Sequence, residues 1–159
     1  MTTIVGTYEC RLDNKGRLLL PAPLKKQWSA CISEGFVMKR SVFRPCLELY
    51  PMSEWNAMMQ KINRLNRFVK KNNDFIRRFT AGVKMIEMDE AGRLLIARDL
   101  STYAGIELPG DLVLASAINI LEIWDKARYE EVLNNDEIDF AELAEEVMGQ
   151  TNDDGNQVS

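Results

Sequence analysis

The sequence contains no histidine, and this absence removes the side chain that enzymes use most often as a general base. It also removes a common nitrogen ligand of metals. The three cysteines, Cys10, Cys31 and Cys46, are odd in number and form no Cys-x-x-Cys pair, so a zinc site is not expected. We expect three reduced cysteines that pack as small apolar side chains, with no metal and no cofactor.

Other functional signatures are also missing from the sequence. No apolar run approaches the ~20 residues that a membrane-spanning helix needs. The first residues, 1–6, lack the basic and apolar regions of a secretion signal. There is no Gly-x-Ser-x-Gly, P-loop or dinucleotide-binding motif. These absences favour a cytoplasmic protein that is not an enzyme, has no membrane partner and takes no small-molecule substrate.

The charge that is present is divided unevenly along the chain. The formal net charge is −4. Residues 134–159 hold no Lys or Arg and eight acidic residues, namely Asp136, Glu137, Asp139, Glu142, Glu145, Glu146, Asp153 and Asp154. The other 133 residues therefore carry 20 basic against 16 acidic groups, a net charge of +4. This division is compatible with a basic body and a solvated acidic tail, whose polar end, 149–159, is expected to be disordered.

What the sequence does contain is an internal repeat. A polar turn followed by an apolar run occurs at 12–21 and returns at 88–97. The matched pairs, all at an offset of 76, are Asp13 with Asp89, Gly16 with Gly92 and Arg17 with Arg93. Because a repeat sets the architecture of a chain before single residues are interpreted, we expect two copies of one βαβ-like unit.

Each copy is expected to contain four short strands and two helices. In the first copy the strands are expected at 7–12, 17–20, 36–39 and 46–50, with helices at 23–28 and from Ser53 onward. In the second copy the strands are expected at 83–88, 93–96, 112–115 and 121–124, with helices at 99–104 and 126–133. The apolar run after Arg17 is typical of a strand that is covered on both faces. Between its third and fourth strands, around 41–45, the first copy is two residues longer than the second.

The segment between the copies, 61–80, is strongly basic. Its apolar residues Ile62, Leu65 and Val69 recur at helical spacing, which predicts a helix, and a break is expected near Asn72 and Asn73 before a second helix. The basic groups would then occupy the outer face of the helix. Such a face fits a solvated surface, and it also fits an electrostatic flank for a nucleic-acid backbone.

The Asp-x-x-x-Arg turn permits a structural role and a functional one. An Asp can accept hydrogen bonds from backbone N–H groups of its own turn, and the Arg can pair with a carboxylate. We favour the structural role for Asp13 and, in the second copy, for Asp89 and Arg93. The glycines Gly16 and Gly92 supply the backbone freedom that a tight turn needs.

The cations of the first turn suggest a second function. Lys15 is expected at the tip of the turn, where its long side chain has no neighbouring surface against which it could be buried. Arg11, Lys15 and Arg17 alternate along the strand, turn and strand, so their side chains are expected on one side. The matching positions of the second copy are Glu87, Ala91 and Arg93. The copies therefore share a scaffold, and the cations at 11 and 15 belong to the first copy alone.

Together these motifs resemble the MraZ family of bacterial transcriptional regulators. The resemblance rests on the two turns, on Gly82 and Glu87 near the second one, and on Leu-Glu-Leu-Tyr-Pro at 47–51 echoed by Leu-Glu-Ile-Trp-Asp at 121–125. It covers residues 4 to 135. It implies an α+β fold, a β-rich AbrB-like swapped-hairpin barrel, also likened to a double-psi barrel, built from two pseudo-equivalent repeats with short flanking helices. Ala91 and Ala97 depart from the family pattern, which weakens a DNA role for the second turn.

The resemblance also implies ring-shaped homo-oligomers that bind repeated promoter boxes upstream of the division and cell-wall gene cluster. In the family the cations of the first motif meet double-stranded DNA, which assigns this role to Lys15 and Arg17, and we add Arg11. The expected segments are a first repeat with its helix (4–62), a basic helical connector (63–80), a second repeat (81–135) and an acidic tail (136–159). A DNA-binding protein of this kind is expected at the nucleoid.

Two other functions remain open from the sequence. One is an antitoxin-like regulator that wraps a protein partner with its acidic tail, although such proteins have one barrel half and this chain has two. The other is an oligomeric structural or protein-interaction module without DNA binding, which salt-dependent DNA binding would exclude.

Overall fold

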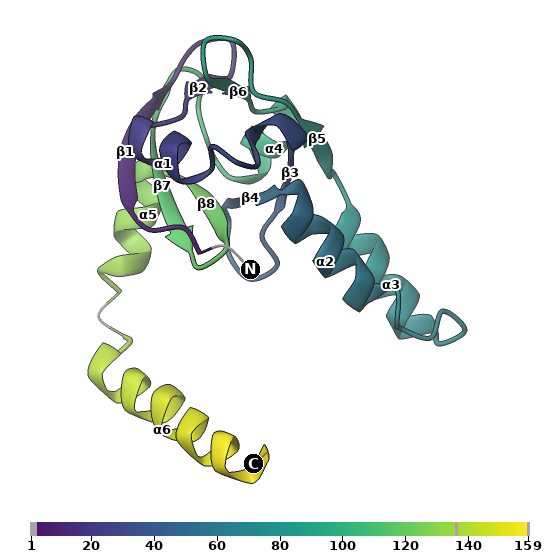
Figure 1. Ribbon diagram of the computed structural model, residues 1–159. Helices are drawn as coiled ribbons and strands as arrows, with labels where there is room; N and C mark the ends of the chain where they lie inside the picture. The colour runs from purple at the N-terminus through teal and green to yellow at the C-terminus, as the bar shows by residue number, and fades with distance from the viewer. Residues whose placement is uncertain (1–2, 136, 159) are drawn as a thin grey trace. The chain divides into compact units, whose positions relative to one another are not determined.

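The chain folds around one barrel of antiparallel strands. The computed structural model describes residues 3–135 and 137–158, of which 150–158 are described for the backbone only. The chain divides into a compact unit that ends at Tyr129 and a second unit that begins at Glu130. In the first unit the eight described strands form a single sheet in the order β5-β3-β4-β8-β7-β1-β2-β6, which curves into a nearly closed barrel (Figure 1). The fold is α+β, as predicted.

The strands are β1 (Thr7–Leu12), β2 (Arg17–Leu19), β3 (Phe36–Arg40), β4 (Leu47–Pro51), β5 (Lys84–Ile86), β6 (Arg93–Leu95), β7 (Gly110–Ala117) and β8 (Ile120–Asp125). The helices are α1 (Ala22–Gln27), the 3-10 turn η1 (Ile32–Glu34), α2 (Met52–Ile62), α3 (Lys70–Thr80), α4 (Arg98–Tyr103), α5 (Lys126–Leu133) and α6 (Phe140–Val158). The predicted bounds of β1 and α5 are confirmed, and each other predicted strand is present.

The two repeats exchange strands instead of folding side by side. Strand β1 of the first repeat pairs with β7 of the second, and β5 of the second pairs with β3 of the first. Strands β2 and β6 pair with each other across the repeats. The prediction of a βαβ-like unit is wrong, because such a unit needs parallel strands and every pairing among the described strands is antiparallel. The expected swapped hairpins account for this pattern.

The barrel is filled by apolar side chains that occupy matching positions in the two repeats. Leu18 and Leu94 lie opposite each other in β2 and β6 and are both fully buried. The neighbouring Leu19 and Leu95 are 58% and 53% exposed. The prediction that this run is covered on both faces is therefore wrong, because successive side chains of a strand point to opposite faces and only the inner face of the barrel is covered. Helices α1 and α4 add Leu24 and Leu100 to the same core.

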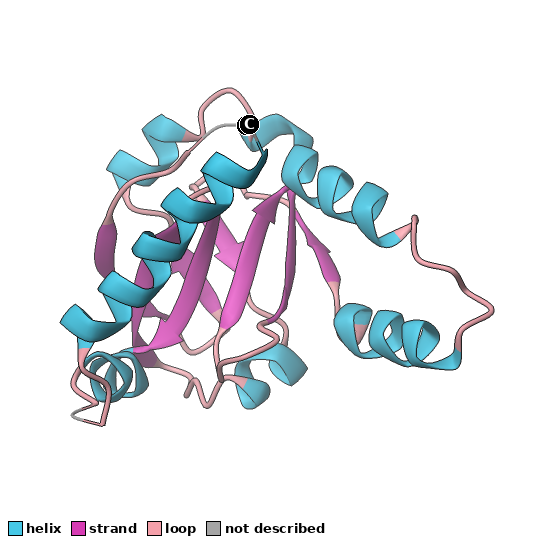
Figure 2. Cartoon of the chain, turned by 90° about the horizontal axis from the view of Figure 1, so that it is seen from below, coloured by secondary structure: helices cyan, strands magenta, loops and turns pink. Residues whose placement is uncertain are grey.

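The connector between the repeats is a helical hairpin (Figures 1 and 2). Helix α2 ends at Ile62, and α3 begins at Lys70, so the predicted break near Asn72 and Asn73 is wrong. The break lies at 63–69 because Asn66 bends the chain there: its side-chain oxygen accepts from the N–H of Phe68 at 3.0 Å, and its carbonyl accepts from Asn72 Nδ2 at 2.9 Å. Asn72 therefore closes the loop from the first turn of α3.

The second unit contains one long helix. Helix α6 runs from Phe140 to Val158. The disorder expected for the chain end from Gly149 stays a prediction. The helix begins after Asp139, whose side chain accepts from the N–H of Glu142 at 3.3 Å, as an N-cap residue does. The sequence interpretation overlooked this start signal. In the described part of the chain, no helix is long and apolar enough to cross a membrane.

Candidate nucleic-acid interface

The first turn is held by one carboxylate. Asp13 Oδ1 accepts from the backbone N–H groups of Lys15 and Arg17, each at 2.9 Å. Asp13 Oδ2 accepts from Arg17 Nε at 2.8 Å. The hydrogen bond from the Arg17 backbone is the largest cause that lowers the pKa of Asp13. These bonds hold the backbone of the turn in place and set the position from which the Lys15 side chain extends.

The second turn repeats these bonds with nearly the same distances. Asp89 Oδ1 accepts from the N–H groups of Ala91 at 3.0 Å and Arg93 at 2.8 Å. Asp89 Oδ2 accepts from Arg93 Nε at 2.9 Å, and the pKa of Asp89 is lowered mainly by the backbone hydrogen bond from Arg93. Arg17 and Arg93 thus do the same structural work, although the sequence assigned DNA contact to the first and scaffolding to the second.

The two turns lie at opposite ends of the short β2–β6 ladder. Gly16 and Gly92 have φ angles of 86° and 83°, in the left-handed region that favours glycine. The carbonyl of Gly16 accepts from the N–H of Ile96 at 2.7 Å, and the carbonyl of Gly92 accepts from the N–H of Leu20 at 3.1 Å. Each turn is therefore fastened to the end of the strand from the other repeat.

The three predicted cations of the first turn lie in different settings. Lys15 is exposed, and no hydrogen bond or ion pair of its side chain is found within the described residues. Arg17 is half-buried and uses Nε for Asp13, which leaves its two terminal nitrogens for another acceptor. Arg11 pairs with Asp111 of β7 at 2.8 Å, but both side chains are about two-thirds exposed (64% and 65%). An exposed pair of this kind contributes little energy and can be exchanged for a phosphate.

The structure places a further cation beside the second turn. Nζ of Lys25, in α1, lies 3.1 Å from the point where a Cβ on Gly92 would stand. The second turn has no lysine of its own, and it receives one from the first repeat. Only the strand exchange brings these segments together, so no local sequence pattern indicated the contact.

The described residues hold no candidate metal site and no activated cysteine. No group of three or more Cys, Asp or Glu side chains that could hold a metal ion is found in that part of the chain. Burial raises the pKa of the Cys10 thiol to about 11 and that of Cys46 to about 12, so both remain protonated at neutral pH and are poor nucleophiles.

Comparison with known proteins identifies one family. The family model of the MraZ protein, which is also described as antitoxin-like, matches the chain twice, at 3–78 and 79–150. The transcriptional regulator MraZ of Flavobacterium psychrophilum is 64% identical over 159 residues, which are 100% of both chains. The regulator of the same name from Christiangramia forsetii is 61% identical over the same coverage. That of Bacteroides thetaiotaomicron is 35% identical over 153 residues, 96% of each chain.

Proposed function

The chain belongs to the MraZ family of transcriptional regulators, and we propose that it acts by sequence-specific binding of double-stranded DNA through its first turn. The observation that supports this most strongly is the exposed Lys15 at the tip of a turn whose backbone is held by three hydrogen bonds to the Asp13 carboxylate. Because the backbone of the turn is already ordered, only the side chain of Lys15 loses conformational freedom when it meets a phosphate or a base edge. A regulator of this kind works at the nucleoid.

The three cations have distinct roles in this proposal. Lys15 contacts a phosphate or a base edge, and Arg11 exchanges Asp111 for a phosphate. Arg17 uses its terminal nitrogens toward a base edge or a phosphate, with guanine in the major groove as the natural specific partner. Lys25, beside the second turn, adds a further positive charge along the same ladder.

A single short turn binds weakly, so we propose that several chains act together. The chain would form a ring-shaped homo-oligomer that places several first turns along repeated promoter boxes upstream of the division and cell-wall gene cluster. Several weak contacts made at the same time then give the assembly a high overall affinity for the repeated boxes. The exposed Leu19 and Leu95, with Met85 on β5, offer apolar surface outside the barrel that a neighbouring chain can cover.

Two measurements test the proposal together. Light scattering at micromolar concentration should give a mass several times the 18.2 kDa of one chain. Fluorescence anisotropy should show tighter binding to a DNA that holds the upstream repeats than to a scrambled DNA of the same length. A monomer in light scattering would contradict the assembly. Equal affinity for the two DNAs would contradict sequence-specific recognition.

A further inference from the structure

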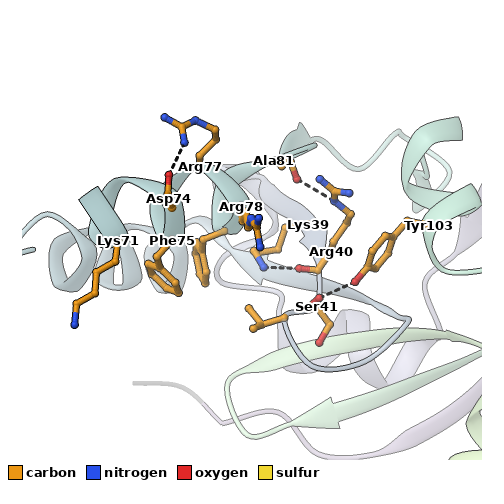
Figure 3. A pocket seen from close by; sticks show the side chains of 12 residues that line it. Lys39, Arg40, Ser41, Lys71, Asp74, Phe75, Arg77, Arg78, Ala81 and Tyr103 are labelled. Carbon is orange, nitrogen blue, oxygen red and sulfur yellow. Dashed lines mark hydrogen bonds and ion pairs between the residues drawn. The ribbon is translucent and has the colours of Figure 1, made fainter. Parts of the chain in front are cut away.

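A hollow of about 760 Å³ lies between β3, α3 and α4 (Figure 3). This volume falls within the roughly 300–1,000 Å³ of small-molecule sites. The hollow does not include the first turn. Five of the side chains that line it are basic and one is acidic, namely Lys39, Arg40, Lys71, Arg77 and Arg78 with Asp74. Such an excess of positive charge points to an anionic ligand.

The cations differ in how far they are already used. Lys39 is buried, at 1% exposure, where its ammonium donates to the carbonyl of Arg40 and lies 3.6 Å from Glu48. Arg77 pairs with Asp74 at 3.1 Å and is turned to the other side of α3 from Phe75 (Figure 3). Lys39 and Arg77 are therefore engaged within the protein.

Three other cations keep donors for a ligand. Arg40 uses Nε for the carbonyl of Ala81, at 3.3 Å, and its Cζ lies 5.1 Å from the centre of the Tyr103 ring. Its terminal nitrogens make no hydrogen bond to the described residues. Lys71 and Arg78, both exposed, show no ion pair or side-chain hydrogen bond to any described residue. They lie on α3 at a spacing of seven residues, with Phe75 between them, so all three occupy one face of the helix.

Aromatic rings accompany these cations. Phe75 is 44% exposed, and Tyr103 of α4 is held by a hydrogen bond from its hydroxyl to the carbonyl of Ser41 at 3.1 Å. Below them, the Phe79 ring packs against Phe75 at 5.5 Å and against Trp55 of α2 at 6.2 Å. A partly exposed ring beside guanidinium groups can hold a flat ligand by stacking while the cations hold its charge.

The second repeat supplies an internal comparison. By the register of β3 with β4 and of β7 with β8, Lys39 and Arg40 correspond to Ala115 and Ser116. In chain order α3 follows α2 in the first repeat as α6 follows α5 in the second, but α6 contains no Lys or Arg. The loop from Ser41 toward β4 is two residues longer in the first repeat than its counterpart. The cations of β3 and α3 therefore belong to the first repeat alone, and they line one hollow.

We propose that this hollow binds a phosphorylated ligand with a planar ring, of the size of a nucleotide. Arg40 and Arg78 hold the phosphates, Lys71 adds charge at the rim, and Phe75 and Tyr103 contact the ring. Charge-assisted bonds from guanidinium to phosphate oxygens are the strong contacts of such a site. The site is separate from the proposed DNA surface and does not depend on it.

Titration of the full-length protein with ADP, pyrophosphate and adenosine tests the proposal. Calorimetry gives the affinity, and the fluorescence of Trp55, which stacks on Phe79, gives a second signal. ADP should bind saturably and more tightly than pyrophosphate or adenosine, because only ADP has both the charge and the ring. Equal binding of ADP and pyrophosphate would overturn the planar ring, and absence of saturable binding by all three would overturn the site.

Variants then locate the site. Arg78→Gln should weaken ADP binding about tenfold, as expected for one lost charge-assisted contact. Phe75→Ala should weaken ADP and leave pyrophosphate unchanged. The matched control is Lys61→Gln, which removes one charge from the exposed surface of α2 outside the hollow and should leave ADP binding within about twofold. Equal losses in Arg78→Gln and Lys61→Gln would overturn the site. A loss of DNA affinity in Arg78→Gln with unchanged ADP binding would also overturn it, and would assign α3 to the nucleic-acid backbone.

Discussion

Replacing Gly16 with alanine should destabilise the protein more than replacing Gly92 with alanine. Both glycines have left-handed φ angles, so an added Cβ is strained in either turn. Their surroundings differ. The Cβ at position 16 would stand 3.0 Å from the carbonyl oxygen of Ile96, which belongs to the backbone of the barrel. At position 92 it would meet Nζ of Lys25 at 3.1 Å, and this flexible side chain can move away.

The expected size follows from these two contacts. The left-handed conformation costs an alanine about 1–2 kcal/mol in each turn. For a chain of this length, 1 kcal/mol lowers the thermal midpoint by about 2–4 °C, so Gly92→Ala should lower it by about 2–8 °C. Gly16→Ala should lower it further, because Ile96 also donates its N–H to the carbonyl of Gly16 at 2.7 Å and cannot shift alone.

Thermal unfolding followed by circular dichroism measures the difference between the midpoints of the two variants. The protein concentrations must be equal, because assembly shifts the midpoint. Gly16→Ala should also weaken DNA binding more, since it distorts the turn that presents Lys15. The double variant should show the sum of the two losses if the turns act independently. A larger loss for Gly92→Ala, or no loss for either, would refute the account of the turns.

Other variants and conditions test the remaining parts. Lys15→Ala should weaken binding to the cognate repeats at an unchanged thermal midpoint and lower the log–log salt slope by about one; unaltered binding would contradict the DNA role. Arg17→Ala should cost about 1–3 kcal/mol of binding if it contacts a base, and it should lower the thermal midpoint as Arg93→Ala does, because both arginines make the same bonds in their turns. A stable Arg17→Ala beside an unstable Arg93→Ala would contradict that equivalence. The pKa values of Asp13 and Asp89 are lowered in the folded state, so their contribution to stability is full above the unfolded value near 3.8 and is lost as the pH falls through the lower folded values. The thermal midpoint of the double variant Asp13→Asn/Asp89→Asn should therefore change less with pH below about 4 than that of the unaltered protein. An unchanged pH dependence would contradict the lowered pKa values. Removing 136–159 should leave the thermal midpoint unchanged and strengthen DNA binding, since this segment has no Lys or Arg; a smaller mass in light scattering would instead show that the segment is needed for assembly.

The sequence predicted those parts of the fold that depend on local chemistry. Strand β1 ends at Leu12 before a turn rich in polar residues, and α5 runs from Lys126 to Leu133, both with the predicted bounds. The turns were recognisable because Asp, Gly and Arg recur at fixed spacing in both copies. Hydrogen bonds within five residues of chain are sufficient to define them.

The missed features depend on contacts between distant segments or on competing local bonds. Lys25 reaches the second turn only because the repeats exchange strands, and the exposure of Leu19 depends on which face of the barrel is filled. In the connector, the apolar spacing of Leu65 and Val69 imitated a helix. The hydrogen bonds of Asn66 instead stabilise a turn at this position, so α2 ends before Leu65.

The exchange of strands has a consequence for how the protein is made. Strand β1 emerges first during translation, but its partner β7 is completed only at Ala117, and β8 ends at Asp125. The early half of the nascent chain therefore waits with unpaired strand edges until nearly the whole barrel has been synthesised. Pairing across such a separation in sequence slows folding and leaves edges open to other chains. The proposed working state is an assembly of identical chains, so several nascent chains can be close together. Pairing of β1 from one chain with β7 of another would then give a domain-swapped, misfolded product.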